Sequence, residues 1–459
     1  VSPDRGMSMV ASSIDGKLRK QVVKLDSAVI AGQSHARITN VLKRPLSAGA
    51  AVQIALLNNR SLQAAFNDLG ISEAQMVQAS LPPDPTFSIA RLSGSLTLEI
   101  ERQILVNLLA LATLPDRQKI AQVKFKQAQL RAIEETLKLA ASTRRAYFQA
   151  VSSRQTIGFL TSANTNARTV SRLFKKLGES GAVNKMDQAR EHVFYAELAG
   201  QLAKVRTEHS ADREKLTRLM GLWSKKTRFK LPHRLPPMPR QPERKPHVER
   251  EAIERNIAIA MARAELDTTI RVLGLTNATR YVNVLELRGM SVFDRDKAID
   301  AGGHIEKVIK NKRGLELEVR VPIFDFGQAR QREAEETYKR AVNRLIAKAV
   351  DVRSMARETY IRYRGTYDLA VHYRRQVLPL RKIIAEESQL RYNAMLIDVF
   401  PLLAEARQRI VSNLTYIAAQ KDFWLAHADM RAAIIGGDAG SVASSQSPVM
   451  AAAAGDAGH

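Results

Sequence analysis

The stretch LELEVRVPIFDFGQAR, residues 315–330, joins an alternating apolar and charged run to a long segment with no strand pattern. A second run, LTLEIERQIL at residues 96–105, has the same alternation and also precedes a long helical pattern. The two runs share four identical pairs: Leu96 with Leu315, Leu98 with Leu317, Glu99 with Glu318, and Ile104 with Ile323. We infer that the chain contains an internal duplication.

Each copy of the duplicated pattern consists of a helix, a strand pair, a long helix, a break and a return helix. The first copy covers residues 46–230, with its strand pair at 86–104 and its break at 178–187. The second copy covers residues 247–435, with its strand pair at 280–323 and its break at 392–398. Between the strands of the second pair we expect a long polar loop, which contains Asp294, Asp296, Gly302, Gly303 and Lys310.

Three segments lie outside the two copies. Residues 1–45 are expected to be a flexible N-terminal extension, and the low-complexity residues 436–459 a disordered tail. LPHRLPPMPRQPERKP, residues 231–246, is predicted to be an extended basic linker because proline dominates it. The apolar spacing in the long segments, for example at Leu130, Ile133 and Leu137, predicts helices that pair as coiled coils.

Composition narrows the function classes. Only 5% of the 459 residues are aromatic, and the dominant residues are those of long packed helices. The chain has no cysteine, which excludes disulfides, thiolate zinc sites and cysteine nucleophiles. The net charge of +25 favours an acidic partner, such as nucleic acid, anionic lipid or an acidic protein. No secretory signal is visible in residues 1–45, so the chain is either cytosolic or a mature or differently started form of an exported protein.

The four strand patterns have one apolar and one charged side. In the first copy Leu98 and Ile100 alternate with Glu99 and Glu101, and in the second copy Glu318 lies on the charged side. Strands of about ten residues with this alternation are typical of membrane-spanning barrels, which must close to pair every edge. Four strands cannot close a barrel, but three chains would supply twelve. A soluble strand pair packed on the helices remains an alternative.

These features resemble the TolC-like outer-membrane efflux proteins, most specifically in LELEVRVPIFDFGQAR, GAVNKMDQAR (181–190) and RYNAMLIDVFPLLAEAR (391–407). The resemblance covers about residues 46–434. It implies a mainly α fold with a small β part: a homotrimer with a twelve-stranded transmembrane barrel in outer-membrane lipid above a tunnel of coiled-coil hairpins in the periplasm. It also implies the exit duct of a tripartite efflux or type I secretion system, with a periplasmic adaptor and an inner-membrane pump as partners.

The resemblance also implies roles for particular residues. Asp187 and Tyr392 lie where the family forms a hydrogen-bonded lock at the closed tip, and Asp398 lies on the first of two acidic positions at the entrance. Gly178 and Gly181 are candidates for adaptor contact. From the residues alone, an Asp or Tyr near a helix break is equally compatible with a cap or a solvated side chain.

Three positions depart from the family pattern at the second break. Pro401 stands at the second acidic position, Ile397 replaces an arginine of the lock, and Met395 replaces the usual tip glycine. Met395 remains a candidate for adaptor contact, and Glu99, Glu101 and Glu318 are candidates for the barrel lumen. The departures predict a gate that is held more weakly, or by other contacts.

A kinase-like triplet at residues 325–327 lacks every companion motif, and the nine histidines show no metal-ligand spacing. We therefore expect no cofactor, no metal and no enzymatic activity. The main rival is a soluble basic coiled-coil protein that binds nucleic acid or acidic membrane surfaces, which the cluster of Arg374, Arg375, Arg381 and Lys382 favours. That rival leaves the strand pairs unexplained, so we do not expect nucleic acid as a partner.

Overall fold

The computed structural model describes residues 4–223, 227–299 and 305–437. The chain forms two compact units that interleave along the sequence. Unit 1 consists of Val1–Ser34, Leu56–Thr136 and Ile253–Ser354, and unit 2 of His35–Ala55, Leu137–Ala252 and Met355–His459. Each unit therefore takes residues from both copies of the duplicated pattern.

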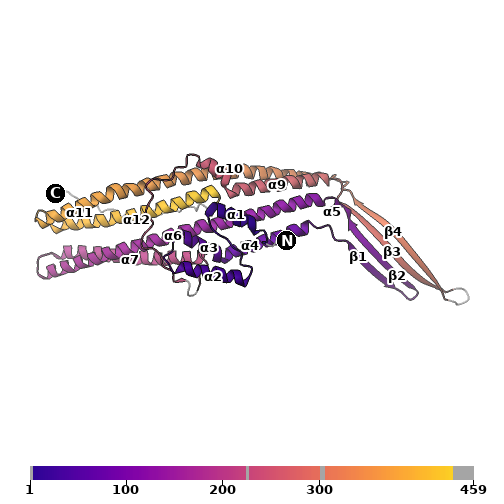
Figure 1. The fold of residues 1–459 in the computed structure, drawn as a ribbon, viewed down its shortest axis with the longest axis horizontal. Helices are drawn as coiled ribbons and strands as arrows, with labels where there is room; N and C mark the ends of the chain where they lie inside the picture. The colour runs from indigo at the N-terminus through magenta and orange to yellow at the C-terminus, as the bar shows by residue number, and fades with distance from the viewer. Residues whose placement is uncertain (1–3, 224–226, 300–304, 438–459) are drawn as a thin grey trace. The chain divides into compact units, whose positions relative to one another are not determined.

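The described residues of unit 1 form an antiparallel sheet whose strands lie side by side in the order β1-β2-β3-β4 (Figure 1). The strands are β1 (Thr86–Ser93), β2 (Thr97–Asn107), β3 (Val284–Ile299) and β4 (Ile305–Arg320). The sheet is joined to helices that include α4 (Arg60–Ala79), α5 (Leu108–Ala112), α9 (Ile257–Ala278) and the first parts of α6 (Leu114–Glu179) and α10 (Gln328–His372). The β-hairpin of each sequence copy thus contributes two neighbouring strands to one sheet.

The opening helix of each copy is broken at an asparagine. The sequence predicts continuous helices over residues 47–80 and 248–275, but α3 (Ala48–Asn58) ends before Asn59 and α8 (Val248–Arg255) ends before Asn256. The Asn59 side chain accepts a hydrogen bond from the Leu62 amide at 3.1 Å, and the Asn256 side chain accepts one from the Ala258 amide at 2.9 Å. Both asparagines cap the following helix, so the break is part of the duplication.

Residues 4–45 are folded, which corrects the prediction of a flexible extension for this part of the chain. It forms α1 (Met7–Leu18) and α2 (Ala28–Leu42). In α1, Met7, Val10 and Ile14 recur at helical spacing and are buried. This apolar stripe packs within unit 1 because burial of these side chains offsets the ordering entropy of the short helix.

The polar loop predicted between the strands of the second pair is also wrong. β3 and β4, each 16 residues long, extend into it as far as Ile299 and from Ile305, and Asp294 pairs with Lys310 across the ladder. The Nζ of Lys312 lies 3.8 Å from the Asp294 carboxylate, so opposite charges support strand pairing where the sequence pattern is polar. Gly302 and Gly303 lie outside the described residues, as do residues 438–459 of the predicted tail.

In unit 2 the second part of α6 lies beside α7 (Lys185–Leu219), and α11 (Leu378–Asn393) lies beside α12 (Val399–Ile435) (Figure 1). The α6–α7 pair has a core of Leu160, Ala163, Ala167, Leu198 and Leu202. The sequence predicts one long helix over residues 325–393, but a π-helical turn, η2 (Tyr373–Val377), interrupts it. A proline in the first turn of α11 explains the interruption, because proline cannot donate the backbone hydrogen bond that would continue α10.

The proline-rich segment 231–246 has no helix or strand, but it is packed rather than free. Trp424 Nε1 and Gln420 Nε2 donate to the Pro236 carbonyl at 3.1 and 3.0 Å, and the Tyr367 hydroxyl donates to the Arg240 carbonyl at 2.8 Å. Leu235 is also buried. The segment is therefore a strap across the helices of unit 2, since side chains satisfy carbonyls that no ladder would pair.

Membrane-spanning helices are not found in the described ranges: no helix there combines the necessary length with the necessary apolar character.

Candidate functional site: a two-faced sheet and two helical tips

The strand register sorts the side chains of the sheet onto two faces. Ile104 pairs with both Phe87 and Gly289, and Gly289 pairs in turn with Leu315. Directly paired residues point to the same side, as do alternate residues along a strand. The resulting apolar face contains Phe87, Ile89, Leu98, Ile100, Ile104, Val106, Leu285, Leu287, Phe293, Ile309, Leu315, Leu317 and Val319.

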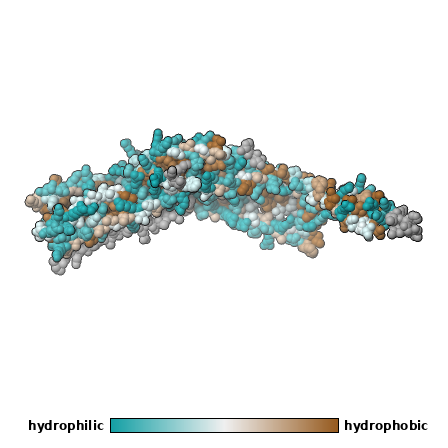
Figure 2. Space-filling view, turned by 90° about the horizontal axis from the view of Figure 1, so that it is seen from below, coloured by the Kyte–Doolittle hydropathy of each residue, from teal (hydrophilic) through white to brown (hydrophobic). Residues whose placement is uncertain are grey.

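The apolar face is largely uncovered. Phe87 is 70% exposed, Ile89 76% and Leu315 81%, although these side chains gain most from burial. Figure 2 shows brown, hydrophobic surface over the strands next to teal, hydrophilic surface. An exposed apolar surface of this extent marks a contact with another protein or with lipid.

The opposite face is charged. The register places Glu99, Glu101 and Glu318 together on it, as the alternation predicts. The Arg320 guanidinium lies 3.2 Å from the Glu318 carboxylate, and Arg288 lies 3.0 Å from Glu316 on the same face. The sheet thus separates an apolar surface from one that requires water, while the place of the three glutamates in a lumen stays a prediction.

β1 and β4 are the two edges of the sheet, and no strand among residues 4–223, 227–299 and 305–437 lies on their outer sides. Each strand is antiparallel to its neighbour, so β1 and β4 run in opposite directions. Their outer backbone groups are available for pairing with a strand of another chain.

The first helical tip joins α6 to α7. The Ala182 amide donates to the Leu177 carbonyl at 2.9 Å, and Gly181 adopts a left-handed φ of 78°. A Cβ at Gly178 would meet the flexible end of the Gln188 side chain, which would have to move. The predicted bend at the two glycines is therefore explained by the backbone itself.

The second tip, between α11 and α12, repeats this geometry. The Leu396 amide donates to the Arg391 carbonyl at 2.9 Å, and the Met395 amide donates to the Tyr392 carbonyl at 3.0 Å. Met395 takes the left-handed position that Gly181 takes in the first tip, with a φ of 59°, and its side chain is 93% exposed. Asp398 is at the N-cap position of α12 but its side chain makes no capping hydrogen bond.

The structure does not bring the predicted lock residues together within one chain. The Asp187 carboxylate pairs with Arg190 at 3.3 Å on its own helix, and within the described residues no hydrogen bond joins it to Tyr392. Tyr392 is 40% exposed. Their role in a lock between helices stays a prediction.

A different contact joins α7 to α12 near the tips. Glu191, whose side chain is only 5% exposed, forms an ion pair with Arg407, and the Arg407 guanidinium lies over the Phe194 ring at 4.6 Å from its centroid. Sequence reasoning missed this pair because its members are 216 positions apart, and the stretch 391–407, which ends at Arg407, does not indicate a partner for that residue. It connects one helical hairpin of unit 2 to the other.

Near these tips, α6 and α7 also form a basic cleft of about 580 Å³. Arg168, Arg172 and Lys175 line it from α6, and all three are exposed. His192 and Tyr195 line it from α7. A surface of this charge suits an acidic partner.

The kinase-like triplet has a structural role at the bend between β4 and α10. Asp325 accepts hydrogen bonds from the Gly327 amide at 3.0 Å and the Ala329 amide at 3.4 Å, and these bonds lower the pKa of its exposed carboxyl. Gly327 has a φ of 72°, and a Cβ there would lie 2.5 Å from the Arg280 carbonyl oxygen. Within the described residues, no group of three or more His, Cys, Asp or Glu could hold a metal ion.

The fold of this chain is similar to that of solved outer-membrane channels. Solved structures with this fold include CusC, with a TM-score of 0.70 at 15% identity over 87% of this chain and 92% of that one. The CmeC outer membrane channel of Campylobacter jejuni has a TM-score of 0.70 at 14% identity over 85% and 86%. VceC, an outer membrane protein of Vibrio cholerae, has a TM-score of 0.67 at 13% identity over 88% and 97%.

No family model and no curated protein sequence matches the chain. The comparison therefore rests on structural likeness, which at these sequence identities shows the fold alone. The resemblance to TolC-like proteins inferred from the sequence is confirmed at that level.

Proposed function

We propose that three copies of this chain form an outer-membrane exit duct that carries small molecules or ions out of the periplasm. The duct would serve a tripartite efflux or type I secretion system. The observation that carries the proposal is the open sheet, with an exposed apolar face, a charged face and two free antiparallel edges. The shared fold of solved outer-membrane channels supports the same reading.

The edges supply the physical argument for a trimer. Since β1 and β4 run in opposite directions, β4 of one copy and β1 of the next can form a further antiparallel ladder. Three such joins close twelve strands. In lipid each unpaired backbone group costs several kcal/mol, roughly, so closure removes the penalty that the single sheet would carry.

Closure would place the apolar face against lipid and the charged face around water. Glu99, Glu101 and Glu318 would then line the barrel, and Asp398 would line the helical entrance as an acidic ring. Such rings attract cations and repel anions of small size.

The helices would lie in the periplasm and meet an adaptor protein at their tips. Gly178, Gly181 and Met395 shape these tips, and the cleft lined by Arg168 and Arg172 offers an acidic adaptor segment a complementary surface. An inner-membrane pump would deliver the substrate and set its identity. No catalytic step is required of the chain.

Cysteine cross-linking tests the closure directly, because the natural chain has no cysteine. Ser88→Cys on β1 is combined in turn with Glu316→Cys, Glu318→Cys or Arg320→Cys on the same face of β4. At least one pair should give oxidised dimers and trimers, and nothing larger, on denaturing gels. Ser88→Cys with Leu317→Cys on the opposite face is the matched control and should stay monomeric.

Conductance of the purified protein in a planar bilayer is the functional readout. Discrete channels are expected, together with a trimer of the purified protein in mild, non-denaturing detergent. A monomer that stays in water without detergent, conducts nothing and binds DNA in a salt-sensitive manner would instead establish the soluble basic protein.

A further inference from the structure

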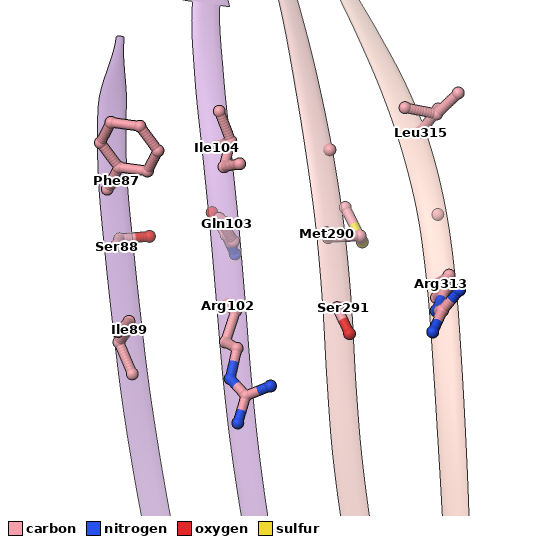
Figure 3. A pocket seen from close by; sticks show the side chains of 12 residues that line it. Phe87, Ser88, Ile89, Arg102, Gln103, Ile104, Met290, Ser291, Arg313 and Leu315 are labelled. Atoms are coloured by element: carbon pink, nitrogen blue, oxygen red, sulfur yellow. The ribbon is translucent and has the colours of Figure 1, made fainter.

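The apolar face contains a cleft of about 790 Å³ across β1 to β4 (Figure 3). Its floor is formed by Gly289 and Ser291 of β3, where the side chains are absent or small. Larger side chains rise on both sides: Ile104 on β2 and Leu315 on β4. The cleft therefore exists because β3 carries small residues between two strands with large ones.

The cleft has two chemically distinct levels. At the upper level in Figure 3, Phe87, Ile104 and Leu315 surround Gly289 with hydrocarbon. One step further along each strand, Arg102, Ser291 and Arg313 are paired across the sheet. The Cα atoms of the two arginines are thus about 9.6 Å apart, two interstrand spacings of about 4.8 Å, with the Ser291 hydroxyl between them.

The two arginines have no carboxylate of their own. Within the part of the chain that the structure describes, neither Arg102 nor Arg313 forms an ion pair, while the charged face holds Arg288, Arg320 and Lys312 in such pairs. In Figure 3 the Arg102 guanidinium points away from Ile104, and its stem lies along the strand. This is the arrangement of a cation that reaches from an apolar surface toward a polar boundary.

The arginine level is also a border on the apolar face. On the side of the helices the face carries only Leu, Ile, Val and Phe side chains with Gly289. On the side of the strand turns, apolar side chains alternate with polar and basic ones, which include Arg91, Arg295, Lys297, Lys307 and Asn311. A border between purely apolar and mixed surface on a lipid-facing sheet is where acyl chains meet headgroups.

We propose that this cleft binds one phosphate-bearing lipid. The phosphate lies between Arg102, Ser291 and Arg313, and an acyl chain lies over Gly289 against Ile104 and Leu315. Guanidinium groups bind phosphate through paired N–H donors, and the serine hydroxyl supplies a further donor. The inference rests on the proposed function, because only a face in a bilayer meets lipid along its length.

Native mass spectrometry of the full-length protein in detergent tests the site with three probes: dioleoylphosphatidic acid, dioleoylglycerol and inorganic phosphate. Phosphatidic acid should remain bound, whereas the diglyceride, which lacks the phosphate, and inorganic phosphate, which lacks the chains, should not. Arg102→Gln with Arg313→Gln should weaken the retention of phosphatidic acid on the order of tenfold or more, because charge-assisted bonds dominate the contact.

Two further variants separate the site from general attraction. Arg91→Gln with Arg295→Gln removes the same charge from the same face and should change retention less than about twofold, since surface charge alone contributes little. Gly289→Leu fills the hydrocarbon level, where a Cβ would have ordinary contact with Leu315 at 3.8 Å, and should weaken lipid retention with both arginines in place.

The inference is overturned if the Arg102 and Arg313 pair of substitutions leaves retention unchanged, if the Arg91 and Arg295 pair lowers it equally, or if inorganic phosphate is retained as well as the lipid. Bilayer conductance of the unmodified protein separates the two proposals. If the unmodified protein conducts and the Arg102→Gln, Arg313→Gln variant retains as much phosphatidic acid as the unmodified protein, the lipid site alone is rejected. If the unmodified protein never inserts into the bilayer, both proposals are rejected.

Discussion

The ion pair between Glu191 and Arg407 gives the sharpest test of how the two helical hairpins of unit 2 are held together. Glu191 on α7 has a side chain that is 5% exposed, and Arg407 on α12 has one that is 37% exposed. The Phe194 ring lies under the guanidinium. The perturbation is a cycle of Glu191→Gln, Arg407→Gln and the double substitution, which removes each charge with little change in volume.

The expected loss of unfolding free energy follows from the unequal burial of Glu191 and Arg407. Loss of one partner from a fully buried ion pair costs about 3–5 kcal/mol, because the other charge is left without compensation. Water reaches Arg407, so its charge is partly screened and we expect about 1.5–3 kcal/mol for Glu191→Gln. Arg407→Gln should cost at least as much, since it leaves the more deeply buried Glu191 unpaired. The coupling energy from the cycle should be about 1–2 kcal/mol.

Thermal unfolding of the helices in detergent, followed by circular dichroism, supplies the four stabilities. Arg190→Gln is the matched control, because its partner Asp187 lies on the same helix and Arg190 is 62% exposed. It should cost less than about 0.5 kcal/mol. Single-channel recording should show a higher open fraction for the variants at the α7–α12 contact only. A coupling energy within about 0.3 kcal/mol of zero would refute the reasoning, because such sites behave as independent.

Three further predictions concern unit 2. Met395→Gly should raise the free energy of unfolding by about 0.5–1 kcal/mol, and Gly181→Ala should lower it by about 1 kcal/mol, because glycine adopts a left-handed φ without strain. Thermal unfolding measures both changes, and two changes of the same sign would contradict this reasoning. Burial lowers the pKa of His427 from 6.5 to about 4. The folded state therefore favours the neutral imidazole, and the free energy of unfolding present above pH 6.5 should fall by about 3 kcal/mol as pH drops through about 4. A His427→Phe variant, measured at pH 7.5 and 4.5, should lack this loss. Trp424→Phe should lower the free energy of unfolding by about 1 kcal/mol, because it deletes a hydrogen-bond donor to the Pro236 carbonyl. An unchanged midpoint of urea unfolding would show that this hydrogen bond does not stabilise unit 2.

The strands and long helices could be predicted because their periodicity is local. Leu98 and Ile100 alternate with Glu99 and Glu101 at a period of two, and this alone fixes which side chains share a face. The duplication predicts a second strand pair, and the structure places both pairs in one sheet.

The errors have equally local causes. Asp294 and Lys310 are depleted in strands on average, but their pairing across the ladder stabilises β3 and β4 where the pattern predicts a loop. The three apolar residues of α1 were too few to predict a packed helix without knowledge of what covers them. The bend at Asn59 is set by a side-chain hydrogen bond that competes with the helix.

The site was predictable only where backbone geometry decides it. Positive φ at Gly181 and at the position of Met395 follows from the turn that both tips share. The pair of Glu191 with Arg407 depends on how two hairpins pack, and no spacing along the chain encodes that. The cleft over Gly289 likewise depends on register between strands of different copies.

The two tips show how a duplication permits unlike roles on one backbone. Gly178 and Tyr392 occupy equivalent positions, since each accepts a hydrogen bond from the left-handed residue three positions later. In the first tip the end of the Gln188 side chain fills the space beside Gly178, and it would have to move to admit a larger residue there. In the second tip the same position carries a half-exposed tyrosine that its own chain leaves without a side-chain partner among the described residues. A gate contact between copies would therefore use the second tip, and the first would hold the hairpin in shape.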